Sequence, residues 1–335
     1  MTTVESLRYR AYRHHGGRVD VVPVEASWRQ LTHVHDHVAL IQPRYTGICS
    51  ADIRELRGER PGRSDFGHEV VGTVLRCTHP MFRDGDSVVM NPFVKTDRET
   101  AFAEMMYLAT SDALVSSALV KVPSDDLQFA LAEPLACAIH AARRSALQET
   151  GPRLVLGAGF FGYLLYHYLE YVGVPVALAN RSSDRLTDLA GRIPTLCTLP
   201  NLEEGAGNFV TVFLTQSRLS RDDVGAAAHL LRDHGEAILF GAFDPSADPQ
   251  LHVTRKQQER VLVTQNGKRF YAQGTLDASL TDLQEAVAVL SRVEFARKLA
   301  PILAAPLSFK QGADHLMRRA SSPRSLRKYM IDMRS

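Results

Sequence analysis

Four side chains that can bind a metal ion stand out in the 335-residue sequence. Cys49 lies in "GICSADI", His68 and Glu69 precede an apolar stretch in "GHEVVGTV", and the helical run "FALAEPLACAIHA" is interrupted by Glu133. Alternation along the second stretch turns either His68 or Glu69 toward the interior, where a charged group needs a partner. A thiol, an imidazole and two carboxylates that converge suit zinc, which accepts sulfur, nitrogen and oxygen ligands and keeps one position open for water or substrate.

Each of these residues also has an ordinary structural explanation when it is taken alone. A cysteine is commonly a small buried hydrophobe, and a histidine is usually a hydrogen-bonded core or surface group. The four cysteines of the chain are scattered without CxxC spacing, which indicates neither a disulfide framework nor a four-thiolate zinc site. The metal prediction therefore depends on whether the four side chains meet in the fold.

A glycine-rich turn predicts a dinucleotide-binding site. The stretch "VLGAGFFG" places Gly157, Gly159 and Gly162 directly after a predicted strand and at the start of a predicted helix. In that context the glycines allow a tight turn, a close approach of the backbone to a pyrophosphate and close packing of helix on strand, while the helix N-terminus offers N–H groups to phosphates. The alternative is an ordinary strand-to-helix turn. The predicted cofactor-binding residues of the loop are Gly157, Gly159, Phe160, Phe161 and Gly162.

The end of the next predicted strand indicates which dinucleotide is bound. NAD-binding folds carry an acidic residue there, about twenty positions after the glycines, for the ribose hydroxyls. In this chain the strand ends in Asn180, Arg181 and Ser182. Arg181 can pair with a 2′-phosphate, and the two polar neighbours can donate hydrogen bonds to it. NADP(H) is therefore the predicted cofactor, and a solvated surface arginine is the alternative.

The elements around these residues indicate two kinds of structure. Residues 18–122 contain short β-prone runs separated by turns. A helical run follows over 127–147, with Ser124 or Asp125 as its N-cap. Beyond it, strands and helices alternate, which predicts an α/β fold with a parallel sheet covered by helices. The predicted strands of that part are 153–159, 175–180, 209–215, 235–241 and 260–265, and its predicted helices include 160–173 and 279–292.

Composition narrows the possible partners and locations. With a formal net charge of +2 and no Lys/Arg-rich segment interleaved with aromatic residues, the chain has no electrostatic footprint for nucleic acid. It contains no run of eighteen apolar residues and no apolar signal-like segment in "MTTVESLRYR". We therefore expect a cytoplasmic protein that acts on a small molecule and has neither a nucleic-acid nor a membrane partner.

Several further stretches occur in an order that is typical of one enzyme family. They are "YTGICSADI", "GHEVVGTVL", "FRDGDSVVMNP", "FAEMMYLATSDALVSSALVKVP", "AEPLACAIHA" and "VLGAGFFG". On these motifs most of the chain resembles the zinc-dependent medium-chain alcohol and polyol dehydrogenases. The resemblance implies a GroES-like, mostly β catalytic domain at 1–150, completed by 294–335, and a Rossmann NADP-binding domain with a doubly wound parallel sheet at 151–293.

The same resemblance assigns roles to the candidate site residues. Cys49 and His68 match the family's first two catalytic zinc ligands, and Glu133 falls where a cysteine or glutamate supplies the third. Glu69 matches a residue that can enter the zinc shell during turnover. Asp52 matches a carboxylate that orients the ligand histidine. Whether Glu69 or Glu133 is the resting third ligand stays open at this point.

The chain also departs from the family pattern. Residues 91–102 are too short and contain no cysteine for the usual structural zinc lobe, so one zinc at most is predicted. Ala51 and Arg54 replace a hydroxyl residue and a histidine that commonly form the proton relay; Arg54 can instead contact a polar or anionic group of the substrate. The basic tail "RRASSPRSLRKYM" is expected to be solvated surface, and the family analogy alternatively lets Lys328 reach a cofactor phosphate.

These observations predict a zinc-dependent NADP(H) oxidoreductase that interconverts a ketone and a secondary alcohol on a polar, sugar- or cyclitol-like substrate. Reduction, in secondary metabolism, is the expected direction. The alternatives are a zinc-free quinone or enoyl reductase of the same superfamily and a non-catalytic nucleotide-binding protein. A homodimer that pairs through an exposed edge strand at 260–265 is the expected assembly.

Overall fold

The computed structural model describes residues 6–60, 66–145, 149–181, 187, 189, 193–198, 207–321 and 327–335. It divides into two compact units, one formed by 1–133 with 279–335 and the other by 134–278. The sequence had predicted the boundaries at 150/151 and 293/294. Both observed boundaries lie earlier in the chain. Most of helix α4 (Ala132–Arg144) belongs to the second unit, and the chain re-enters the first unit at Ser279, the N-cap of α9 (Leu280–Leu290).

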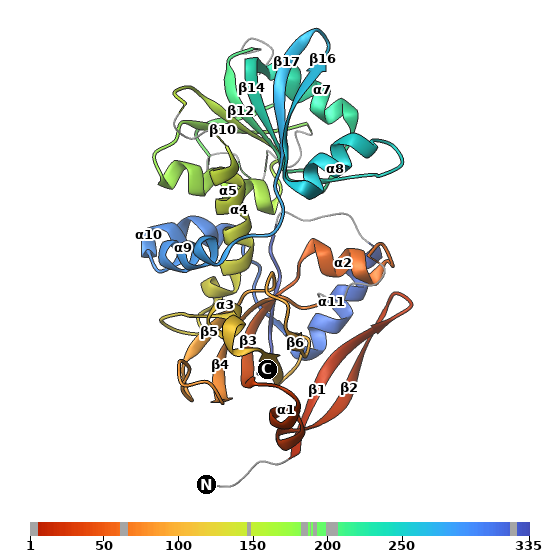
Figure 1. Ribbon diagram of the computed structural model, residues 1–335, viewed down its shortest axis with the longest axis vertical. Helices are drawn as coiled ribbons and strands as arrows, with labels where there is room; N and C mark the ends of the chain where they lie inside the picture. The colour runs from red at the N-terminus through yellow and green to blue at the C-terminus, as the bar shows by residue number, and fades with distance from the viewer. Residues whose placement is uncertain are drawn as a thin grey trace. The chain divides into compact units, whose positions relative to one another are not determined.

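The first unit is built on an irregular, mostly antiparallel sheet (Figure 1). Its strands follow the order β18-β19-β3-β4-β5-β8, with β7 on β3 and β6 on β7, and only β18 and β19 pair in parallel. A separate hairpin joins β1 (Ser6–His15) to β2 (Arg18–Ser27). The strands of the sheet are β3 His37–Gly47, β4 Glu69–Cys77, β5 Ser87–Met90, β6 Asp97–Arg98, β7 Met106–Thr110, β8 Leu119–Lys121, β18 Leu307–Ser308 and β19 Met330–Asp332.

Alternating side chains of this sheet form its core. Val70 and Val74 of β4 pack with Val88 and Met90 of β5 and with Leu108 of β7, all nearly fully buried. Short helices occupy the connections between the strands. The helices of the unit are α1 Trp28–Val34, α2 Ser50–Leu56, α3 Asp112–Ala118, α9 Leu280–Leu290, α10 Val293–Leu299 and α11 Phe309–Ser321, with 3₁₀ turns η1 Leu127–Leu131 and η3 Ala300–Ile302.

The helical run expected over 127–147 is interrupted, and its predicted cap was wrong. A 3₁₀ turn, η1, begins after Asp126, and α4 begins anew at Ala132. Ser124 instead donates a side-chain hydrogen bond to Asp126 (2.6 Å). Pro134 explains the break, because a proline fits the first turn of a helix but clashes with the preceding turn inside one. Glu133, beside it, therefore lies at the start of α4.

The second unit contains the predicted parallel sheet (Figure 1). Its strands follow the order β11-β10-β9-β12-β14-β17-β16, and all neighbours pair in parallel except the edge pair β16 and β17. Apart from β16, the spatial order is third-second-first-fourth-fifth-sixth, which is the doubly wound arrangement. The α/β fold prediction is thereby confirmed. The strands are β9 Arg153–Leu156, β10 Val176–Asn180, β11 Leu196–Thr198, β12 Phe209–Leu214, β14 Leu231–Leu239, β16 Arg260–Gln265 and β17 Lys268–Gly274, and the helices include α5 Phe160–Tyr171, α7 Arg221–Leu230 and α8 Pro249–Gln257.

Strands β13 (Arg218–Leu219) and β15 (Ala242–Phe243) form a separate two-stranded parallel sheet. Nearly fully buried residues of β9, β12 and β14 form one core cluster with residues of α7, among them Leu154, Val212 and Val224. None of the helices in the described part of the chain has the length and apolar character that crossing a lipid bilayer requires.

Candidate metal and nucleotide sites

Cys49 occupies the turn between strand β3 and helix α2. It is the N-cap of α2, with an extended backbone (φ −88°, ψ 155°), and its sulfur accepts a hydrogen bond from the Ala51 N–H (3.4 Å). Its own N–H donates to Asp52 Oδ2 (2.7 Å). This capping box fixes the direction of the half-buried thiol. Burial, followed by the charge of Glu69, raises the pKa of that thiol, so a bound metal would have to displace its proton.

Asp52 also contacts His68. Its Oδ1 accepts a hydrogen bond from the Gly67 N–H (2.9 Å) and lies 3.6 Å from Nδ1 of His68. Both side chains are almost fully buried. Burial would lower the pKa of the imidazole, but the charges of Cys49, Asp52 and Glu133 outweigh it, and the net shift is well upward. A carboxylate beside Nδ1 orients a histidine so that Nε2 is the nitrogen for a metal.

Glu69 is paired with a residue from the far end of the chain. Its carboxylate forms an ion pair with the ammonium of Lys328, and both residues are at most 5% exposed. The same ammonium donates to the Ile48 carbonyl oxygen (2.9 Å). Burial would lower the pKa of Lys328, but Glu69 and Cys49 raise it, with an upward net shift. The assignment of Lys328 to a cofactor phosphate thus missed its actual partners.

Gly47 makes room for this pair. It lies opposite Glu69 in the β3–β4 pairing. A Cβ atom at Gly47 would overlap the Glu69 carboxylate and crowd the Lys328 side chain. The glycine is therefore required by close packing and not by its backbone conformation.

The structure brings three of the predicted ligands together. The ligand atoms of Cys49, His68 and Glu69 all lie within 4.8 Å of one another. Glu133 is outside that group, although its carboxylate is close enough to raise the pKa of both His68 and Lys328. A thiol, an imidazole and a carboxylate this close together form a donor set that fits zinc.

The two positions that depart from the family relay lie on α2. Ala51 is half-buried and has no titratable group. Arg54 lies with its Nε 3.6 Å from Glu59 Oε2. The guanidinium thus has a carboxylate neighbour, and it stays charged at any ordinary pH.

The glycine turn of the second unit has the geometry that its sequence predicts. Gly157 adopts φ +121°, and a Cβ atom there would meet the Thr215 hydroxyl. A Cβ atom at Gly162 would overlap the Gly157 carbonyl oxygen, so close packing of α5 on β9 depends on that glycine. Gly159 is the N-cap of α5 and provides no side-chain cap, which leaves the first N–H groups of the helix for an anionic ligand.

The remaining predicted cofactor residues lie around this turn. Asn180, at the end of β10, accepts a hydrogen bond from the Ala158 N–H (3.2 Å). Phe160 is half-buried. The ring of Phe161 stacks on that of Phe240, with centroids 3.4 Å apart. Ser182 lies outside the described residues.

Arg181 has a partner that sequence reasoning missed. Its guanidinium, on a side chain that is 56% exposed, forms an ion pair with the buried carboxylate of Asp223. Asp223 also accepts hydrogen bonds from the backbone N–H and the hydroxyl of Ser220 (both 2.8 Å) in the capping box of α7. The spacing of Ser220 and Asp223 was readable in the sequence, but the approach of Arg181 was not.

The sequence matches one protein-family model and is similar to known dehydrogenases. Residues 35–118 match the alcohol dehydrogenase GroES-like domain. The chain is 26% identical to L-galactonate-5-dehydrogenase of Escherichia coli over 268 residues, which cover 69% of this chain and 78% of that protein. It is 30% identical to an uncharacterized zinc-type alcohol dehydrogenase-like protein of Haemophilus influenzae, over 42% of this chain and 48% of that one.

The fold is also similar to solved structures. The crystal structure of TarJ from S. aureus in complex with NADPH superimposes with a TM-score of 0.71 at 16% identity, covering 97% of this chain and 99% of that one. At this identity the likeness concerns the fold alone.

Proposed function

The chain belongs to the medium-chain dehydrogenase/reductase superfamily, and on that premise we propose that it is a zinc-dependent NADP(H) oxidoreductase that interconverts a ketone and a secondary alcohol. The observation that carries the proposal is the close approach of Cys49, His68 and Glu69, whose ligand atoms lie within 4.8 Å of one another. A thiol and an imidazole that Asp52 orients supply two ligands of a zinc site, and the neighbouring carboxylates can supply a third.

Cys49 and His68 would hold the zinc ion with Glu133 as the proposed third ligand, which lies outside the group of ligand atoms within 4.8 Å of one another but close enough to act on His68 by its charge. A bound zinc ion would supply a Lewis acid for the substrate oxygen, and a bound NADP(H) would supply or accept the hydride. Glu69 is a poorer resting ligand because the Lys328 ammonium already neutralises its carboxylate. Asp52 holds the His68 ring, and the Cys49 turn fixes the thiol.

The proton of the alcohol needs a route that differs from the usual family relay. Ala51 can neither accept nor donate a proton, and the Arg54 guanidinium does not titrate in the ordinary pH range. Neither position can therefore pass a proton to solvent. Arg54 is instead suited to a polar or anionic part of the substrate, in competition with Glu59.

The cofactor preference rests on Arg181. Its guanidinium has five N–H donors in a planar fork, so it can contact both Asp223 and a ribose 2′-phosphate. Because NADPH serves mainly as a reductant in cells, reduction of the ketone, in secondary metabolism, is the proposed direction.

The substrate class is a hydroxyl-rich small molecule such as a sugar or cyclitol. The name of the E. coli relative, L-galactonate-5-dehydrogenase, supports a sugar-derived substrate.

The proposed setting is the cytoplasm, and the proposed assembly is a homodimer that pairs through β16, an edge strand on which Leu262 is 44% exposed. Sedimentation equilibrium of wild type and L262E tests the assembly. Wild type should be a dimer, and L262E should be a monomer.

One experiment separates the enzyme from its two alternatives. The full chain is purified without chelator, its zinc content is measured, and oxidation of NADPH and NADH is followed with a panel of ketoses, a quinone and an activated alkene. Zinc together with NADPH-dependent ketose reduction supports the proposal. Quinone or alkene reduction without zinc contradicts it in favour of the zinc-free reductase. Binding of NADPH with no turnover on any substrate contradicts it in favour of a binding protein.

A further inference from the structure

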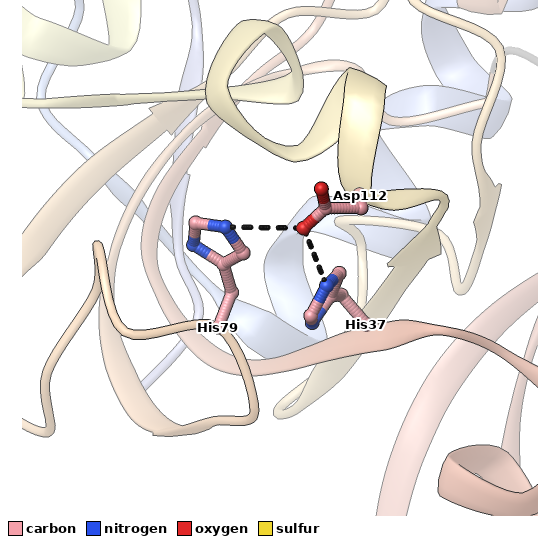
Figure 2. Close-up of side chains that lie close together, drawn as sticks. All are labelled: His37, His79 and Asp112. Atoms are coloured by element: carbon pink, nitrogen blue, oxygen red, sulfur yellow. Dashed lines mark hydrogen bonds and ion pairs between the residues drawn. The ribbon is translucent and has the colours of Figure 1, made fainter.

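A second cluster of metal-binding side chains lies in the first unit and shares no residue with the cluster of Cys49, His68 and Glu69 (Figure 2). It combines His37, the first residue of β3, His79, in the turn after β4, and Asp112, the first residue of α3. The three side chains come from separate segments and point toward one another in Figure 2. The proposed reaction does not use them, and a metal ion here would be a second one, beyond the single zinc that the sequence predicted.

The distances suit a single small cation. Asp112 Oδ1 lies 2.9 Å from His37 Nε2 and 3.6 Å from His79 Nε2. One ligand atom from each residue lies within 4.8 Å of the others, and the two imidazole rings meet edge to face with centroids 4.7 Å apart. Two ligands about 2.1 Å from a tetrahedral zinc ion are separated by about 3.4 Å. Small side-chain rotations would therefore bring all three atoms to bonding distance.

The cluster is open to solvent on one side, so a metal ion could enter it and keep a bound water molecule. The Asp112 side chain is 78% exposed, whereas those of His37 and His79 are 20% and 16% exposed. The two rings are thus largely buried, and the carboxylate is the solvent-exposed member of the cluster. An ion here would keep at least one position for water, as three-ligand zinc sites do.

The hydrogen-bond contacts of the Nδ1 atoms of His37 and His79 limit the affinity of the cluster for a metal ion. His79 Nδ1 accepts a hydrogen bond from the Met81 N–H (3.2 Å), and His37 Nδ1 lies 3.5 Å from the Thr78 hydroxyl. In the metal-free chain His79 therefore carries its proton on Nε2, facing Asp112. Metal at Nε2 moves that proton to Nδ1 and breaks the bond from Met81, a cost of about fivefold in affinity, the equivalent of one ordinary hydrogen bond.

We propose that His37, His79 and Asp112 bind one divalent transition-metal ion, zinc in the first place, through Nε2, Nε2 and a carboxylate oxygen. The ion ties the start of β3 to the turn after β4 and to the start of α3, and it has a structural role in the first unit. Imidazole and carboxylate ligands select zinc and its neighbours in the first transition series over the larger calcium ion, which takes oxygen ligands. The proposal does not rest on the proposed function.

Cobalt titration of the chelator-stripped full chain tests the site. Co²⁺ bound by the thiol of Cys49 gives a sulfur-to-cobalt charge-transfer band, whereas Co²⁺ bound by His37, His79 and Asp112 gives only ligand-field bands. We expect wild type to bind two equivalents. The variant H79N should bind one equivalent and keep the charge-transfer band. The control H33N, which replaces an exposed histidine in α1 outside the cluster, should bind two.

The reciprocal variant keeps this result separate from the proposed function. C49S should lose the charge-transfer band yet still bind one equivalent, which D112N in the same background should abolish. Because Asp112 is exposed, D112N also replaces H79N if that variant does not fold. Equal numbers of bound equivalents in wild type, H79N and D112N would overturn the proposal, whatever happens at Cys49.

Discussion

The substitution K328M should strongly destabilise the first unit. Lys328 and Glu69 are 5% and 1% exposed, and the ammonium is also hydrogen-bonded to the Ile48 carbonyl oxygen. Removing one partner of a buried ion pair leaves the other charge uncompensated, which costs about 3–5 kcal/mol. E69Q alone should cost a similar amount, because it leaves the buried ammonium without its carboxylate.

The double variant distinguishes a charge effect from a packing effect. K328M/E69Q removes both charges of this ion pair, so its free energy of unfolding should return to within about 1–2 kcal/mol of wild type, with a coupling energy of about 4 kcal/mol or more. Urea denaturation of the metal-free chain, followed by the fluorescence of Trp28, measures it, because Trp28 is the single tryptophan and lies in the first unit. A double variant as unstable as the sum of the single ones would refute the reasoning, as would K328M with wild-type stability.

Three further predictions follow from individual contacts. R181A should lower kcat/KM for NADPH about tenfold and leave that for NADH nearly unchanged in steady-state assays, because an exposed charge-assisted contact to the 2′-phosphate is lost; an equal loss with both cofactors would contradict the assignment. G47A should lower the free energy of unfolding by about 1–3 kcal/mol in the Trp28 assay, because its Cβ overlaps Glu69. The side-chain hydrogen bond from Arg10 lowers the pKa of Glu104. Wild type should therefore be more stable than E104Q, by at most about 1 kcal/mol, at pH values above the ordinary carboxyl pKa. This difference in the free energy of unfolding should vanish as the pH falls through the lowered pKa of Glu104.

Local patterns predicted much of the fold. Apolar runs and the glycine turn identified β9, β10, β12 and α5, because each has a periodicity or a turn residue that can be read over a few positions. Strand β17 was not predicted. Its stretch "KRFYAQG" is rich in polar residues, and only Phe270 and Ala272 show, once folded, that it faces the core.

The contacts of the candidate site were less accessible from the sequence. Cys49 and His68 could be predicted as metal ligands because cysteine and histidine are uncommon residue types and both lie in recognisable motifs. The partners Lys328 and Asp223 were not, because their contacts join segments whose approach depends on the whole fold. The cluster of His37, His79 and Asp112 was invisible for the same reason, since each residue is isolated in the sequence.

The most direct test of the central claim is the sulfur-to-cobalt charge-transfer band of the Co²⁺-loaded full chain, compared between C49S and C77S. Cys77, half-buried at the end of β4, is the matched control in the same unit. A catalytic metal held by Cys49 predicts that the band is present in wild type and C77S and absent in C49S. A band of equal strength in C49S, or no band in wild type, would contradict the account.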